Sequence, residues 1–174
     1  PSARTRVKKR TNILGWVLRN IKNSCWPGLP GGMKGAQKKN IYFLIFYNTA
    51  DNPDHESHYL KLLLKQSVDG IIMIPTTDSK YQDIENIIRE KKPTVFLDRV
   101  FDEVIENLRE GKATKQGVVL LDNVKGGYIA TKHLIEHGHR RIGCITGPLK
   151  NKSAFDRLQG YRQALDEAGI AYQP

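Results

Sequence analysis

Short apolar runs alternate along the chain with segments in which apolar residues recur at helical spacing. Each run has the length of a β-strand, and glycine, proline and asparagine mark most of the joins. Continuous apolar strands separated by amphipathic helices are typical of a parallel sheet with helices on both faces. The sequence therefore predicts an α/β fold with three layers. The predicted strands are residues 13–18, 41–47, 70–74, 94–97, 117–121 and 142–146.

The helices between these strands have recognisable start and stop signals. Asn52 can cap the helix that precedes the strand at 70–74, and Ser153 can cap the last helix. Gly138 can end a helix predicted over residues 124–137, and Gly169 can end the last one. The expected apolar stripes are Leu60, Leu63, Leu64 and Val68, then Tyr81, Ile84, Ile87 and Ile88, and finally Leu158, Tyr161 and Leu165.

Two stretches do not fit this alternation. Residues 23–39 stand where the first helix is expected, but they contain two prolines and four glycines. An interior proline costs a helix about 3 kcal/mol and a glycine about 1 kcal/mol, so no regular helix is expected before about residue 31. Residues 106–115 are polar and rich in charge, and no element is predicted there.

Polar side chains that could bind a ligand lie in the predicted strand-to-helix loops. Right-handed crossovers bring these loops to the carboxyl edge of the sheet, where open α/β sheets bind ligands. Asp98 and Arg99 directly follow a predicted strand, and Arg157 lies in the first turns of the last helix. Carboxylate and guanidinium groups suit a polyol such as a sugar, and Trp26 could supply a flat apolar face. A surface ion pair of Asp98 with either arginine is the alternative that the residues leave open.

The net charge of +10 is concentrated near the N-terminus. The first fifty residues hold ten of the 28 lysines and arginines and no acidic residue, so the rest of the chain is electrically balanced. Such a block favours a solvated arm that meets nucleic acid or another anionic surface, although a flexible tail without a partner has the same composition. The basic residues of this arm are Arg4, Arg6, Lys8, Lys9 and Arg10.

Several classes of protein are disfavoured by composition. No apolar run approaches the ~18 residues of a membrane-spanning helix, and no secretion signal is recognised, so a cytoplasmic protein is expected. The two cysteines are too few for a disulfide framework, and Cys144 is expected to be an inert thiol in a buried strand. Neither a phosphate-binding glycine loop nor a Gly-x-Ser-x-Gly elbow occurs, so we expect no cofactor and no enzyme activity.

One short motif is compatible with catalysis. His133, Glu136 and His137 have the H-x-x-E-H spacing of one class of zinc protease, in which two histidines on one helical face share a metal ion. A third protein ligand is still required, and nothing beyond closeness in sequence places Asp156 or Glu167 there. A zinc hydrolase therefore remains a remote alternative, and no metal site is predicted.

Five short motifs occur in order along about residues 40–170. They are Val68–Ile72, Pro93–Arg99, Asp122 and Asn123 with Gly126 and Gly127, His133–Ile142, and Arg157–Tyr161. In this order and spacing the motifs resemble those of the lactose-repressor/galactose-repressor family of transcription regulators.

The resemblance implies a periplasmic-binding-protein-like effector domain of type I, with two α/β lobes and a ligand cleft between them. Residues 1–11 would be the remnant of a basic hinge, residues 12–121 the first lobe, and residues 122–174 the incomplete start of the second. The chain departs from the family after its first strand, which puts the family's first helix in residues 23–39 in doubt. The effector-binding residues that we predict are Trp26, Asp98, Arg99, Phe155 and Arg157.

The function implied by the resemblance is that of the effector-sensing part of a transcriptional regulator. A sugar is the expected effector and a purine is a weaker candidate, whose binding alters affinity for operator DNA in the full-length protein. The basic arm would lie close to DNA phosphates, and the regulator is expected to be a homodimer without membrane contact. A transport-type sugar-binding protein of the same fold is the alternative.

Overall fold

The computed structural model of the 174-residue chain describes residues 10–20 and 42–173. The chain forms two compact units, residues 1–119 and residues 120–174. Among the described residues, no helix is both long and apolar enough to cross a membrane.

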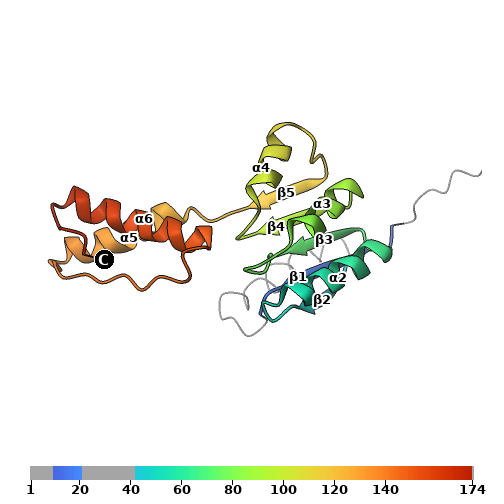
Figure 1. Ribbon diagram of the computed structural model, residues 1–174, viewed down its shortest axis with the longest axis horizontal. Coiled ribbons are helices and arrows are strands. Elements are labelled where there is room, and N and C mark those ends of the chain that lie inside the picture. The colour runs from blue at the N-terminus through green and yellow to red at the C-terminus, as the bar shows by residue number, and fades with distance from the viewer. Residues whose placement is uncertain (1–9, 21–41, 174) are drawn as a thin grey trace, which may run out of the picture. The chain divides into compact units, whose positions relative to one another are not determined.

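The first unit is built on a five-stranded parallel sheet (Figure 1). The strand order is β2-β1-β3-β4-β5, so the chain crosses over between strands. This arrangement confirms the predicted α/β fold with a parallel sheet, because all four pairings are parallel. The strands are β1 (Ile13–Leu18), β2 (Phe43–Asn48), β3 (Gly70–Met73), β4 (Thr94–Leu97) and β5 (Gln116–Val119).

Three helices cover one face of this sheet. They are α2 (Pro53–Lys65), α3 (Tyr81–Arg89) and α4 (Asp102–Arg109). The predicted cap of α2 is confirmed, because the Asn52 side chain accepts hydrogen bonds from the backbone N–H groups of Asp54 and His55, at 2.8 and 3.2 Å. The helix in doubt over residues 23–39 lies outside the described residues.

Helix α4 is a correction to the sequence analysis, which predicted no element over residues 106–115. The helix begins earlier, at Asp102, and its first turn carries two acidic residues while Arg109 lies in its last turn. These charges suit the two ends of the helix dipole. Val104 is fully buried and Leu108, four residues later, packs against the same core. Two core contacts from this helix of eight residues are sufficient because the sheet supplies the rest of the burial.

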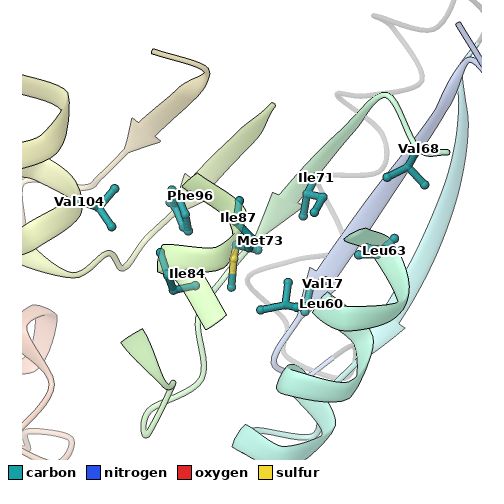
Figure 2. Packing of buried hydrophobic residues seen from close by; sticks show 10 residues of the cluster. All are labelled: Val17, Leu60, Leu63, Val68, Ile71, Met73, Ile84, Ile87, Phe96 and Val104. Atoms are coloured by element: carbon teal, nitrogen blue, oxygen red, sulfur yellow. The ribbon is translucent and has the colours of Figure 1, made fainter. Parts of the chain in front are cut away.

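The core of the first unit lies between the sheet and these helices (Figure 2). The register places Val17, Met73 and Phe96 in one row across β1, β3 and β4, and all three are fully buried. Leu63 of α2 packs so closely over β1 that a methyl group added at Gly15 would collide with it. The cluster drawn in Figure 2 is Val17, Leu60, Leu63, Val68, Ile71, Met73, Ile84, Ile87, Phe96 and Val104.

The second unit is a pair of packed helices, α5 (Asn123–Glu136) and α6 (Lys152–Glu167). The predicted inward face of α6 is confirmed, because Leu158, Tyr161 and Leu165 are buried and form a core cluster. The predicted stops are confirmed too, since Gly138 and Gly169 adopt positive φ angles just after the helices end.

Two predictions for this unit are wrong in detail. The cap of α6 is Asn151 rather than Ser153, which lies buried inside the first turn. Residues 142–146 form no strand, because every strand in the described part of the chain belongs to the first unit and none is present to share a hydrogen-bond ladder. Cys144 is consequently exposed rather than buried, and Ile145 is fully exposed.

Candidate functional site

The carboxyl ends of the strands bring four polar loops to one edge of the first unit. Arg19 follows β1, Asp51 follows β2, Thr77 follows β3, and Asp98 and Arg99 follow β4. Parallel register makes these loops neighbours although they are far apart in sequence. Their side chains form one connected polar network, which we call the edge network and which consists of Arg19, Asp51, Thr77, Asp98 and Arg99.

Asp51 connects the loops after β1, β2 and β3. Its backbone N–H donates to the carbonyl of Arg19 at 2.8 Å, and the Arg19 Nε lies 3.4 Å from its Oδ1. Its two carboxylate oxygens accept from the backbone N–H and the hydroxyl of Thr77, each at 3.0 Å. Asp51 and the preceding Ala50 both have positive φ angles, which aspartate adopts more readily than most residues. The left-handed backbone thus turns the carboxylate toward the loop after β3.

Thr77 extends the network to the loop after β4. Its hydroxyl donates to Asp51 and accepts from a terminal nitrogen of the Arg99 guanidinium at 3.1 Å. The Nε of Arg99 lies 3.8 Å from Oδ2 of Asp98, and both of these side chains are about one-fifth exposed. The ion pair considered in the sequence analysis is therefore present for Arg99. The same geometry leaves part of the Asp98 and Arg99 side chains open to solvent.

A buried carboxylate binds the loop that carries Thr77. Glu56 extends from the first turn of α2 and is only 1% exposed. Its Oε2 accepts from the backbone N–H of Thr76 at 2.6 Å, and its Oε1 accepts from the hydroxyl of Ser79. Burial raises the pKa of Glu56, and the hydrogen bonds from Ser79 and Thr76 partly oppose that rise.

The N-terminal halves of α5 and α6 hold the predicted residues of the second unit. The Arg157 guanidinium donates to Oδ1 of Asn123 at 2.7 Å, next to the Asp122 cap of α5. The helices cross closely here, because a methyl group at Gly127 would collide with the backbone of Arg157. Phe155 is 43% exposed one turn after the start of α6. Arg157 is thus packed closely against α5 through its backbone and bonded to it through its side chain, and the residue is exposed.

The predicted site residues divide between the two units. Asp98 and Arg99 lie in the first unit, whereas Phe155 and Arg157 lie in the second. Trp26 lies outside the described residues. The same holds for most of the basic arm, namely Arg4, Arg6, Lys8 and Lys9.

Arg10, the one described residue of the arm, is exposed at the opposite edge of the sheet. The two residues that follow it are bound by Asp69, which precedes β3. The Asp69 carboxylate accepts from the backbone N–H groups of Thr11 and Asn12, at 3.0 and 2.8 Å, and from the Thr11 hydroxyl at 3.1 Å. These bonds lower the pKa of Asp69, and the charge of Arg10 adds to the effect. Asp69 therefore anchors the two residues that directly follow Arg10.

Sequence reasoning found the loops of the edge network but not all of its members. It selected Asp98 and Arg99 and missed Arg19, Asp51 and Thr77, as well as Glu56 behind them. Their only signal was their position directly after predicted strands or in the first turn of a helix, which many surface residues share. Their importance comes from contacts between residues that are 20 to 32 positions apart in the sequence.

The zinc hypothesis gains no support from the described residues. His133 and His137 lie on the exposed side of α5 with ring centroids 4.2 Å apart, and the Nδ1 of His137 is 2.8 Å from the carbonyl oxygen of His133. Among the described residues, no group of three or more histidine, cysteine, aspartate or glutamate side chains could hold a metal ion. The third protein ligand that a zinc site requires is therefore missing in this part of the chain.

Comparisons with known proteins give a consistent result. The family model for periplasmic binding proteins and the sugar-binding domain of the LacI family matches residues 11–174. The ribose operon repressor of Haemophilus influenzae is 36% identical over 99% of this chain and 48% of its own length. The HTH-type transcriptional repressor PurR of Aliivibrio salmonicida is 31% identical over all of this chain and 50% of its own length.

The solved structures that this chain resembles are also those of transcription regulators. The crystal structure of a putative ribose operon repressor from Burkholderia thailandensis matches 94% of this chain and 58% of its own chain, with a TM-score of 0.79 and 27% identity. The structure of transcription regulator CcpA of Lactococcus lactis matches 94% of this chain and 56% of its own chain, with a TM-score of 0.75 and 25% identity. The chain spans about half the length of the curated relatives that it matches.

Proposed function

Since the chain belongs to the family of periplasmic binding proteins and LacI-type sugar-binding domains, we propose that it is the effector-sensing portion of a transcriptional regulator. In this proposal it binds a sugar, in preference to a purine, between its two lobes. Binding favours one arrangement of the lobes and thereby changes the affinity of the whole protein for operator DNA. Asp98, Arg99, Phe155 and Arg157 are the proposed effector contacts, together with Trp26.

The edge network is the observation that supports a sugar as the proposed ligand. Two guanidinium groups, from Arg19 and Arg99, stand beside two carboxylates, from Asp51 and Asp98, so the charges balance. A sugar hydroxyl both donates and accepts, and it can bond to either kind of group. A phosphate group would bring negative charge to carboxylates that are already partly desolvated. The network thus supports a neutral polyol over a phosphorylated sugar.

The DNA partner and the assembly are further parts of the proposal. The relatives are named as repressors of an operon or of transcription. We propose that in the whole protein Arg4, Arg6, Lys8, Lys9 and Arg10 lie close to operator phosphates, where lysine and arginine contribute a salt-sensitive attraction. We also propose that the regulator acts as a homodimer in the cytoplasm.

Titration calorimetry of the chain tests the proposed ligand class. The panel contains D-ribose, D-xylose and D-glucose, the purines hypoxanthine and guanine, and ribose 5-phosphate as the charged counterpart of ribose. We expect a neutral sugar to bind, and ribose 5-phosphate to bind more weakly than ribose. If the whole panel fails to bind, or only a purine binds, the proposal of a sugar sensor is wrong.

Substitutions then test the proposed contacts. Arg157→Ala is expected to make the binding free energy of the sugar less favourable by about 2 kcal/mol, because a charged hydrogen bond is lost. Lys152→Ala is the matched control, since this residue also carries a positive charge at the start of α6 but pairs with Asp156 at 3.4 Å. Equal losses for the two variants would show that general charge, rather than a contact from Arg157, determines the affinity.

A further inference from the structure

Glu56 is an unusual residue for the interior of a protein. A carboxylate is rarely buried unless its oxygens are fully hydrogen-bonded, because burial removes its hydration. Glu56 is 1% exposed, yet it lies on α2, where an apolar side chain would pack against the sheet without this penalty. Its contacts indicate what it does at this position.

The two oxygens of Glu56 hold the loop that follows β3. One accepts from the backbone N–H of Thr76 and the other from the hydroxyl of Ser79. Thr76 lies beyond the last residue of β3, so its N–H has no partner in the sheet and needs another acceptor when buried. Glu56 supplies that acceptor from α2. Thr77, the next residue, carries the contacts to Asp51 and Arg99.

We propose that Glu56 is a positioning residue of the edge network, which places Thr77 by holding the Thr76 amide and the Ser79 hydroxyl. Its consequence for ligand affinity rests on the proposed function. Loss of both bonds would free the loop after β3, and Thr77 would no longer hold the Asp51 carboxylate and the Arg99 guanidinium in one arrangement. Glu56 itself need not touch the ligand, because it acts through its bonds to Thr76 and Ser79 in the loop that carries Thr77.

A second buried carboxylate in the same region provides a matched control. Asp83 of α3 is 9% exposed and accepts a hydrogen bond from the hydroxyl of Ser57 on α2. Its carboxylate joins the two helices and has no described bond to the loop after β3. Asp83→Ala should therefore destabilise the fold in a way similar to Glu56→Ala without loosening Thr77.

Glu56→Gln separates geometry from charge. The glutamine amide oxygen can accept from Thr76, and its NH₂ group can donate to the Ser79 oxygen if that hydroxyl turns around. Both bonds then survive in a neutral side chain. Glu56→Ala removes both, so a purely geometric role predicts that glutamine preserves what alanine destroys.

Hydrogen exchange and sugar titration on the full chain test the proposal. In Glu56→Ala we expect the Thr76 and Thr77 amides to exchange about tenfold faster, and the affinity for the bound sugar to fall about tenfold, as for the loss of roughly one net hydrogen bond. Glu56→Gln and Asp83→Ala should both keep the wild-type exchange rates and the wild-type affinity. If Glu56→Ala does not fold, Ser79→Ala replaces it, with an expected change of about threefold in both measurements.

The results separate this proposal from the proposed function. Wild-type exchange and affinity in Glu56→Ala, or equal effects in Asp83→Ala, would overturn the positioning role. If the wild type binds no sugar at all, the proposed function fails, and the exchange rates of Thr76 and Thr77 alone decide whether Glu56 positions the loop.

Discussion

Two adjacent glycines in α5 give opposite predictions for the same substitution. A methyl group added at Gly126 would meet no atom within 4 Å, whereas one added at Gly127 would lie 3.0 Å from the Cα of Arg157 and closer still to its carbonyl group. These are backbone atoms of α6, so no side chain can move aside. Gly127→Ala therefore forces α5 and α6 apart, and with them the pair formed by Asn123 and Arg157.

The expected magnitudes follow from these contacts. Alanine in place of an interior helical glycine stabilises by up to about 1 kcal/mol, which is the expectation for Gly126→Ala. Gly127→Ala gains the same helix propensity, but overpacking costs about 1–3 kcal/mol and more when backbone must move. We therefore expect Gly127→Ala to be about 2–3 kcal/mol less stable than Gly126→Ala.

Urea unfolding followed by circular dichroism measures the overall stability of both variants, and hydrogen exchange in α5 and α6 assigns the change to the second unit. A Gly127→Ala variant at least as stable as Gly126→Ala would refute the close crossing of the two helices. Slower exchange throughout α6 in Gly127→Ala would refute it equally.

The remaining predictions concern pH. The folded-state pKa of Glu56 is raised above its ordinary value of 4.5, so the folded chain binds more protons than the unfolded chain in the window above that value. The stability of the wild type relative to Glu56→Gln should fall as pH rises through this window, and an unchanged difference in urea unfolding across it would contradict the burial of Glu56. The folded-state pKa of Asp69 is lowered below its ordinary value of 3.8. The wild type should therefore be more stable than Asp69→Asn above that value and lose this advantage as pH falls through the folded-state pKa, whereas an advantage that persists at lower pH would show that the Asp69 charge is not involved.

The sequence was a good guide to the elements of the first unit. Thr94–Leu97 was predicted at its observed bounds, because a short apolar run bounded by a proline and an aspartate is typical of a buried strand. Helix α4 was missed because its three apolar residues, Val104, Ile105 and Leu108, lie among five polar ones, four of which are charged. The run at 142–146 looked like the other strands, but strand formation depends on neighbouring strands and not on the run itself.

The candidate site was predictable only in part. Asp98 and Arg99 follow a strong strand signal, and their position at the carboxyl edge follows from parallel topology. Glu56 and Thr77 carry no such signal, because Glu56 is one of several polar residues at the start of α2. Only the three-dimensional structure brings the loop after β3 onto Glu56 and connects Thr77 with both Asp51 and Arg99.

Backbone amide NMR spectra recorded during titration with D-ribose and the other neutral sugars would test the sugar-sensor account most directly. The account predicts that the largest shift changes in the first unit occur at Thr77, Asp98 and Arg99, and in the second unit near Phe155 and Arg157. Changes confined to the opposite edge, around Thr11 and Asp69, or spectra that no sugar alters, would contradict it.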